Sequence, residues 1–479
     1  MRLASGHGTR TARRLTTPRL GLALCVFVLL AAAWRLPIAH CRLERDDSIR
    51  SGSSNRQPSP RSGPIVNQQS QALLTAADEV FREVSSITGL PIKAPLKKEV
   101  VDHDQMSQYL IASLRADYSP REIHAQEAML KAFGLVAPDF DLEKFLITFY
   151  AEQAAGVYDP RRKTMLIAAW VDQDTQKVVL AHELTHALQD QSYDLRKFLQ
   201  DRRDDDDATA ARQAIAEGHA TAAMMQTMVA PQKLEDLPTV VPLMSMNMEM
   251  QIEQYPVFSS APFFFRYQAL FPYAQGARLM QRGLKQGGWQ KLRDFFLHPP
   301  ETTKEIFEPD FYFEHQRLPE VALPDPRPMQ HHQRLRVVER NRMGQLGYYC
   351  LLGQLLSEEE AKKVAPSWLA DRYLVYEDSA GHRYAVVARV RWAGAEAAAG
   401  FFRDLHTILV KKYPDMGTMR AVPSPAPLGE SGSSAGAAAV VGSTSVGTVV
   451  VVRRGDEVLW AEGVPSAQLE AMLDYLRSL

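Results

Sequence analysis

Residues 179–188 (VLAHELTHAL) constrain the fold of this chain more than any other segment. Their only chargeable side chains are His182, Glu183 and His186. Residues four apart on an α-helix differ by about 400° in rotation and about 6 Å in rise, so the two imidazoles project from one face. Two ligands of one tetrahedral metal ion require this geometry. The segment therefore predicts a buried helix that carries part of a metal site.

Glu183 stands beside the two imidazoles, where a carboxylate can take a proton from metal-bound water. The pattern predicts Zn²⁺ on His182 and His186, with Glu183 as the general base of a peptide hydrolase. The metal would polarise the carbonyl and acidify its bound water, and Glu183 would pass the proton to the leaving amine. A chance HExxH is the alternative in a chain with 13 histidines, but the apolar flanks argue against chance.

Two imidazoles leave a third ligand to find, and the sequence excludes the commonest choices. A histidine six residues after His186 would indicate a metzincin, but Ser192 occupies that position. The chain has 3 cysteines, Cys25, Cys41 and Cys350, which provide neither a disulfide framework nor a cysteine metal site. We interpret Cys350, which lies in an apolar stretch, as a buried small apolar residue.

Glu217 is the best candidate for the third ligand. It is the lone acid in the small, apolar segment 214–220 of a predicted helix at 206–228. An unpaired buried carboxylate is costly, and a nearby cation removes that cost. Gly218 and the alanines would let this helix approach the HExxH helix closely. The alternative is a carboxylate that faces solvent or pairs with Arg212.

The run HELTHALQDQ at 182–191, with Glu217-Gly218-x-Ala220 after it, resembles a group of largely uncharacterised bacterial HExxH metallopeptidases. Other pieces are similar to this group in the same order: Glu152-Gln153-x-x-Gly156-x-Tyr158-Asp159-Pro160, Pro272-Tyr273-x-x-Gly276, Gly287-Gly288-Trp289, Pro299-Pro300-x-Thr302-Thr303-x-Glu305, and Trp368 with Asp371-Arg372-Tyr373. The resemblance covers most of residues 72–479 and implies a gluzincin-type zinc site with Glu217 as a ligand. It brings no established substrate. His219 departs from the group's pattern, which has an acid there, so how that position would steady a ligand is in doubt.

Other polar residues are candidates for supporting roles. Asp190, four residues after His186, either accepts a hydrogen bond from a ligand imidazole or caps the end of the helix. Peptide hydrolysis usually needs an oxyanion donor besides the metal, and Tyr273, His219 and His298 are candidates. Each of these three is as easily explained as a structural residue.

Three further patterns do not predict a site. The acids at 204–207 lack the ligand spacing and central glycine of a calcium loop, so we assign them to helix capping and the helix dipole. We interpret the alternating methionines at 244–250 as flexible core or groove lining rather than as copper(I) ligands. The histidine pair at 331–332 has no spacing from other candidate ligands that would indicate a metal site.

The N-terminus predicts export. Arginines precede an uncharged, mostly apolar run at 20–34, which fits the h-region of a secretory signal better than the ~20 residues that span a bilayer. We predict a signal peptide or membrane anchor at 1–41, with cleavage near 31–33, a retained anchor and lipidation of Cys41 as alternatives. Residues 42–70 are predicted to be a disordered linker. The protein would then lie in the periplasm, at the cell envelope, or outside the cell.

Helical patterns dominate from residue 72, and period-two alternation follows from Trp368. Helices are expected at 72–87, 103–116, 119–133, 141–155, 175–191, 206–228, 343–364, 394–412 and 466–478, and strands at 92–101, 164–168, 373–376, 384–390, 448–453 and 457–461. Residues 240–345 are expected to be mixed and loop-rich, and 429–447 to be a loop. We predict a mainly α (α+β) protein with a gluzincin-like zincin core and helical additions at 71–365, and a small α+β domain at 366–479.

Composition limits the partners. The chain has 55 basic and 56 acidic residues, so its charge gives no reason to expect nucleic acid. The expected partner is a protein or peptide substrate, and membrane association would run through the N-terminal segment. The alternative function is an exported envelope binding or assembly protein with a structural or vestigial metal site. A fourth protein ligand would favour this alternative, and an open fourth position would favour the enzyme.

Overall fold

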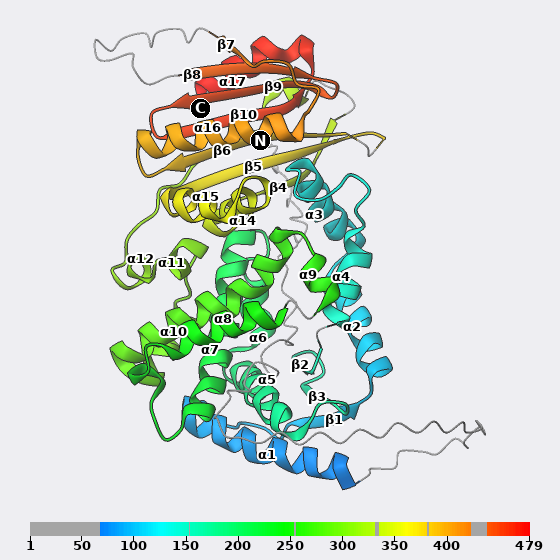
Figure 1. Ribbon diagram of the computed structural model, residues 1–479, viewed down its shortest axis with the longest axis vertical. Helices are drawn as coiled ribbons and strands as arrows, with labels where there is room; N and C mark the ends of the chain where they lie inside the picture. Colours follow the sequence, from blue (N-terminus) through cyan, green and yellow to red (C-terminus); the bar gives the residue numbers. More distant parts are fainter. Residues whose placement is uncertain (1–67, 153, 253–254, 331–334, 381–382, 423–437) are drawn as a thin grey trace, which may run out of the picture.

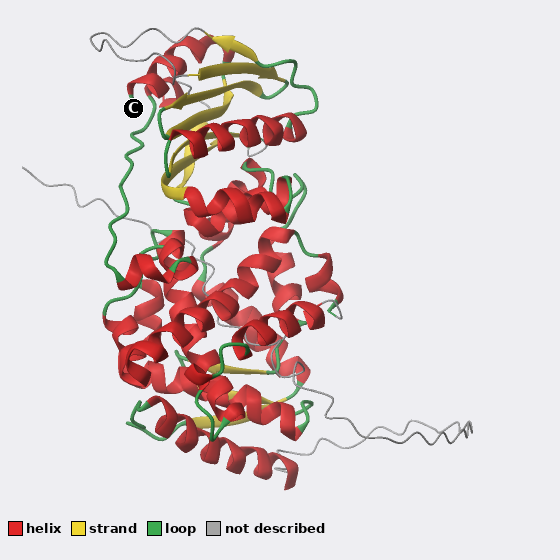
Figure 2. Ribbon diagram, turned by 60° about the vertical axis from the view of Figure 1, so that its left-hand side comes forward, coloured by secondary structure: helices red, strands yellow, loops and turns green. Residues whose placement is uncertain are grey.

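The computed structural model describes residues 68–152, 154–252, 255–330, 335–380, 383–422 and 438–479 (Figure 1). A helical body lies at one end, and a sheet with flanking helices lies at the other (Figures 1 and 2). The prediction of a mainly α, α+β protein with a C-terminal sheet is confirmed. The predicted signal or anchor and nearly all of the predicted linker lie outside the described residues. Within the described residues, no helix is long and apolar enough to cross a membrane.

The helical body opens with α1 (Gln68–Thr88), α2 (His103–Asp117), α3 (Pro120–Ala132), α4 (Leu142–Ala151), α5 (Gln173–Tyr193), α6 (Leu195–Gln200) and α7 (Asp206–Val229). Side-chain caps start α2 to α5 and α7, at Asp102, Ser119, Asp141, Asp172 and Asp205. The helical body also contains a small sheet of three strands, β1 (Lys97–Val101), β2 (Gly156–Asp159) and β3 (Thr164–Ala168). Their order in the sheet is β1-β3-β2. β2 is an edge strand that contacts α5, so it lies beside the HExxH helix.

The expectation that residues 240–345 are loop-rich is wrong, because most of this segment is helical. After η2 (Leu234–Asp236) come α8 (Val240–Ile252), α9 (Pro256–Ser260), α10 (Phe263–Leu297), α11 (Thr303–Phe307), α12 (Pro309–Phe313) and α13 (Arg327–Gln330). Pro272 lies inside α10, and Gly287 and Gly288 have non-helical backbone angles within it. Proline and glycine usually end helices, so they concealed α10 in the sequence. The helix continues through Pro272, but Gly287 and Gly288 form a kink between two helical segments of α10.

The C-terminal part is a seven-stranded sheet in the order β4-β5-β6-β10-β9-β8-β7. Its strands, all antiparallel to their neighbours, are β4 (Leu335–Asn341), β5 (Trp368–Asp378), β6 (Tyr384–Trp392), β7 (Arg420–Val422), β8 (Ala438–Thr444), β9 (Gly447–Arg454) and β10 (Glu457–Val464). Alternate valines of β9 enter two different cores, one shared with α16 (Ala395–Lys412) and one with α17 (Leu469–Ser478). The two helices therefore cover opposite faces of the sheet.

Two local expectations in this part are wrong. The helix expected at 343–364 is divided into α14 (Gly344–Leu355) and α15 (Glu358–Val364), because Leu356 leaves the helical region and Ser357 caps a new helix. The short helices η3 (Ala365–Ser367) and η4 (Ser466–Gln468) precede β5 and α17. Part of the expected loop at 429–447 is β8, which pairs with β9. β4 pairs with β5, so the sheet includes residues from both sides of the expected boundary at 366.

Candidate metal centre

The helix α7, which carries Glu217, packs against both α5 and α10. A Cβ on Gly218 would lie 2.4 Å from the carbonyl carbon of Gly276 in α10, and one on Gly276 would lie 2.3 Å from the carbonyl oxygen of Ala214. Only glycine permits this approach. The sequence suggested that Gly218 faces the HExxH helix, but the tight contact is with α10. It holds α7 against α10 on one side while Glu217 reaches α5 on the other.

His182, His186 and Glu217 come together inside the protein, with their ligand atoms all within 4.8 Å of one another. The Nε2 atoms of His182 and His186 are 3.0 Å apart. Oε2 of Glu217 lies 3.0 Å from Nε2 of His182 and 3.3 Å from Nε2 of His186. The three residues that the sequence nominated as ligands therefore form one cluster that could hold a metal ion.

The donor atoms of this cluster suit Zn²⁺, which binds imidazole nitrogens and carboxylate oxygens. Ligand atoms around one tetrahedral Zn²⁺ lie about 3.3 Å apart, so the observed spacings need to widen by at most about 0.3 Å. In the described part of the chain, the cluster contains no fourth histidine, cysteine or acid. Three protein ligands leave a position for water or substrate, which is typical of catalytic zinc sites.

The electrostatics of the cluster also favour a cation. Burial opposes ionisation of Glu217, but the charge of His186 and the hydrogen bond with His182 hold its pKa well below the usual range. Burial would lower the pKa of His186, but the charge of Glu217 and its hydrogen bond, together with Glu183 and Gln189, outweigh burial and raise that pKa to about 9. The buried carboxylate thus requires a positive charge beside it, and a metal ion would supply one.

Gln189 contacts the candidate cluster, and the sequence did not single it out. Its Oε1 lies 2.9 Å from Nδ1 of His186, and its Nε2 donates to the carbonyl oxygen of Ala216 at 2.9 Å. With Oε1 as acceptor, Nδ1 of His186 carries the proton and Nε2 keeps its lone pair for a metal. The available signal was the spacing of three residues from His186, which places both side chains on one helix face.

Asp190 takes neither of the two roles that the sequence left open: Asp194 is the C-cap of α5, and the Asp190 side chain binds groups that follow or flank that helix. Its carboxylate accepts hydrogen bonds from the hydroxyl of Tyr158 at 2.6 Å and the backbone N–H of Leu195 at 3.1 Å. It also pairs with Lys163 at 2.5 Å. These contacts tie the end of α5 to the β2–β3 turn and to the start of α6. Asp190 therefore anchors the HExxH helix without contacting a ligand imidazole.

Glu183 is held by the edge strand β2. Its Oε2 accepts a hydrogen bond from the backbone N–H of Tyr158 at 2.7 Å, while Oε1 has no hydrogen-bond partner among the described residues. Burial raises the pKa of Glu183 to about 8. A carboxyl group whose pKa is near neutral can both accept and return a proton. Its surroundings therefore suit acid–base chemistry beside the cluster.

Of the three oxyanion candidates, two lie near the cluster. The ring centroid of Tyr273 is 5.9 Å from that of His182. His219 is fully buried, its Nδ1 lies 3.2 Å from Nε2 of Gln189, and burial lowers its pKa to about 3. In the described part of the chain, His298 makes no hydrogen bond or ring contact with the cluster; it caps the end of α10.

His219 therefore takes the place of the expected acid as a neutral side chain next to Gln189. Its ring also packs edge-on against Trp289, at 5.6 Å between centroids. Trp289 follows the irregular Gly287-Gly288 turn of α10, as an aromatic anchor at a turn would. A neutral ring near Gln189 can orient the amide without adding charge.

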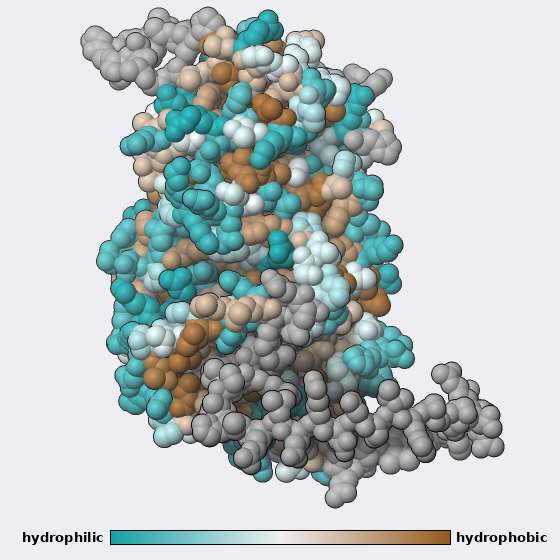
Figure 3. All heavy atoms as spheres, in the orientation of Figure 1, coloured by the Kyte–Doolittle hydropathy of each residue, from teal (hydrophilic) through white to brown (hydrophobic). Residues whose placement is uncertain are grey.

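The remaining sequence patterns lie elsewhere or have structural roles. On α8, Met244 and Met248 are buried while Met246 and Met250 are 57% and 61% exposed. Apolar side chains gather on the visible face where α8 and α10 lie (Figure 3). Asp205 caps α7 through the N–H of Ala208, as the capping interpretation requires. The histidine pair at 331–332 lies outside the described residues.

Two family models match separate parts of the chain. Residues 141–238 match the IrrE N-terminal-like domain, a peptidase family (Peptidase M78), and residues 333–473 match a domain of unknown function, DUF8575. The first match includes α5 and α7 with all three clustered side chains, and the second covers most of the C-terminal sheet. Comparisons with curated proteins and with solved structures give no match. The part of the chain that carries the buried His-His-Glu cluster is therefore similar to a metallopeptidase-like family.

Proposed function

We propose that the protein is a zinc-dependent peptidase of gluzincin type, with His182, His186 and Glu217 as ligands and Glu183 as general base. The observation that carries this proposal is the convergence of the three ligand atoms within 4.8 Å in the interior, with Glu183 next to them in the motif. The similarity of residues 141–238 to a peptidase family supports it. The substrate would be a polypeptide.

The chain's own residues account for the proton and orientation steps. When bound, Zn²⁺ supplies a Lewis acid that polarises the scissile carbonyl and acidifies water. Gln189 keeps His186 in the tautomer that presents Nε2. The N–H of Tyr158 fixes one oxygen of Glu183, which leaves Oε1 to take a proton from water and return it to the leaving amine.

The test compares the wild type with Glu183→Gln. The variant keeps all three proposed ligands, so we expect unchanged zinc stoichiometry by elemental analysis. Hydrolysis of a mixed peptide library, followed by mass spectrometry, should fall by at least about 100-fold. Glu143→Gln, on the exposed side of α4, is the matched control and should retain both properties. Full activity of Glu183→Gln would refute the mechanism.

Burial of the site favours a second candidate. His182, Glu183, His186 and Glu217 are 0–2% exposed, as in a structural metal site. An envelope binding or assembly protein with such a site would lose stability on chelation, while neither the wild type nor Glu183→Gln would hydrolyse any peptide. Under both candidate functions we propose that the protein is exported. N-terminal sequencing of the mature protein from cell fractions tests this.

A further inference from the structure

Small residues make up about half of the buried positions of α7. They are Ala208, Ala211, Ala214, Ala216, Gly218, Ala220, Ala222 and Ala223. Large side chains that interlock in grooves fix the axial position of a helix, whereas small residues make shallow ridges. Besides the contact of Gly218 with Gly276, the contacts at the N-terminal end of α7 therefore help to set the axial position of Glu217.

Contacts from two other segments hold the N-terminal end of α7. The backbone N–H of Asp206 donates to Oδ1 of Asn341, at the end of β4, over 2.9 Å. The buried carboxylate of Asp207 accepts hydrogen bonds from the backbone N–H of Thr303, at 3.0 Å, and from its hydroxyl. These bonds are made to the first turn of α7, so they fix the position of the helix along its axis and its rotation about that axis.

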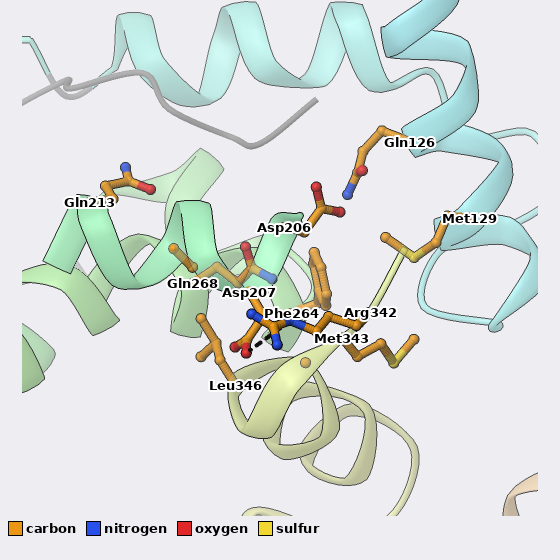
Figure 4. A pocket seen from close by; sticks show the side chains of 12 residues that line it. Gln126, Met129, Asp206, Asp207, Gln213, Phe264, Gln268, Arg342, Met343 and Leu346 are labelled. Atoms are coloured by element: carbon orange, nitrogen blue, oxygen red, sulfur yellow. Dashed lines mark ion pairs between the residues drawn. The ribbon is translucent and has the colours of Figure 1, made fainter. Parts of the chain in front are cut away.

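Arg342 adds charge to this contact. Its Nε donates to Asp205 at 2.8 Å and lies 3.5 Å from Oδ2 of Asp207 (Figure 4). Its terminal nitrogen donates to the carbonyl oxygen of Glu301. Arg342, which directly follows β4 in the chain, therefore connects this edge of the C-terminal sheet to the α7 cap and to the loop before α11.

Residues of two sequence motifs that have no role in the proposed zinc chemistry also lie at this contact with the N-terminal end of α7. Thr303 belongs to the Pro-Pro-x-Thr-Thr motif, and Asp371 belongs to the motif that starts at Trp368. Asp371 accepts hydrogen bonds from the backbone N–H groups of Met343 and Gly344, at 2.8 and 3.0 Å. Gly344 has a φ of 69°, and a Cβ on it would overlap the side chain of Asp207.

A cavity of about 50 Å³ lies at this contact, lined in part by Gln126, Asp206, Gln213, Gln268 and Arg342 (Figure 4). A volume of about 50 Å³ has room for one or two water molecules and not for a peptide. The contact is thus a polar joint between the C-terminal sheet and α7 rather than a second substrate site.

We propose that this joint, formed by residues 205–207, Thr303, Asn341 and Arg342, positions Glu217 for metal binding. Arg342 is then a positioning residue that contributes no ligand. Asp207 and Glu217 are about 15 Å apart along the helix, so the effect is transmitted by α7 itself. Metal sites need their ligands placed within about 0.5 Å, so a small axial shift weakens binding. This proposal rests on the proposed zinc site.

The test measures the zinc affinity of the full-length protein by competition with a chromophoric chelator, for wild type, Arg342→Met and Arg342→Lys. Arg336→Met is the matched control, because Arg336 is on β4, the strand that directly precedes Arg342, and pairs with Glu377 at 2.8 Å instead of with α7. We expect Arg342→Met to weaken zinc affinity severalfold, up to about the tenfold that loss of a direct outer-shell partner causes. Arg342→Lys should weaken it less, and Arg336→Met should leave it unchanged.

The direction of the change in zinc affinity distinguishes a positioning role of Arg342 from a direct effect of its charge. Removing a positive charge by itself strengthens binding of a cation, so weaker binding in Arg342→Met indicates positioning. Equal or tighter binding overturns the proposal, and so does a loss in Arg336→Met as large as in Arg342→Met. If Arg342→Met does not fold, Asn341→Ala removes the acceptor for Asp206 and carries the same expectation. A wild type that binds no zinc would instead refute the proposed function, and this proposal with it.

Discussion

The contact between Gly218 and Gly276 allows one substitution to test how the metal site is built. In Gly218→Ala, the new Cβ would lie 2.4 Å from the carbonyl carbon of Gly276, about 1 Å closer than ordinary contact at 3.4–4 Å. Both sides of this contact are backbone, so no side-chain rotation relieves it. The helices α7 and α10 must therefore move apart.

The magnitude follows from two opposing terms. Overpacking of this kind costs about 1–3 kcal/mol, whereas Gly→Ala inside a helix gains about 1 kcal/mol. We expect a net loss of unfolding free energy of up to about 2 kcal/mol. A displacement of about 1 Å also exceeds the roughly 0.5 Å tolerance of a metal site, so zinc affinity should fall by about tenfold or more.

The assay combines urea unfolding of the metal-free protein with chelator competition for zinc. Gly400→Ala is the matched control, because it lies in α16 and its Cβ would find only a flexible Arg403 nitrogen, at 3.9 Å. This control should gain up to about 1 kcal/mol and keep its zinc affinity. Wild-type zinc affinity in Gly218→Ala would refute the argument that this contact positions Glu217.

Two further predictions follow from buried hydrogen bonds. Gln189→Leu removes the acceptor for Nδ1 of His186, so zinc affinity should fall by about tenfold, and by less in Gln189→Glu, which keeps an acceptor; unchanged zinc retention in the leucine variant would contradict this. Burial raises the pKa of Asp371 from 3.8 to about 6, against the backbone N–H bonds from Met343 and Gly344. The folded state therefore holds the Asp371 proton more tightly than the unfolded state does. The resulting contribution of Asp371 to the free energy of unfolding is fully present below about pH 4 and is lost as pH rises to about 6. Urea unfolding should show the wild type losing up to about 3 kcal/mol relative to Asp371→Asn over that range, and parallel pH profiles would show that Asp371 does not titrate there.

The sequence was informative wherever a local pattern determines a structure. The spacing of His182 and His186 requires only helical geometry, and the lone acid at Glu217 stands out against its alanines. Alternation in β5, β6 and β9 predicted strands because each face of the sheet meets its own apolar core. In contrast, the helix around Pro272 was missed because proline resembles a helix end in the sequence, whereas the glycines at 287–288 do mark a kink in α10.

Other features depended on partners far along the chain. Gln189 is an ordinary glutamine until α7 places Ala216 and His219 beside it. The role of Asp190 was left open because Tyr158, which precedes it by 32 residues, decides it. Of the acids at 204–207 that were assigned to helix capping and the helix dipole, Asp205 caps α7. The contacts of Asp207 with Thr303 and Arg342 exist only in the folded chain.

The sequence alone thus determined which residues were candidates for the metal cluster, because ligand type and helical spacing are local properties. It nominated two histidines and two acids, and the fold placed the three proposed ligands in one buried cluster. Only the tertiary structure decided how the cluster is supported, through the glycine contact, Gln189 and the joint with the C-terminal sheet. Support of this kind depends on distances between segments far apart in sequence, which no local pattern specifies.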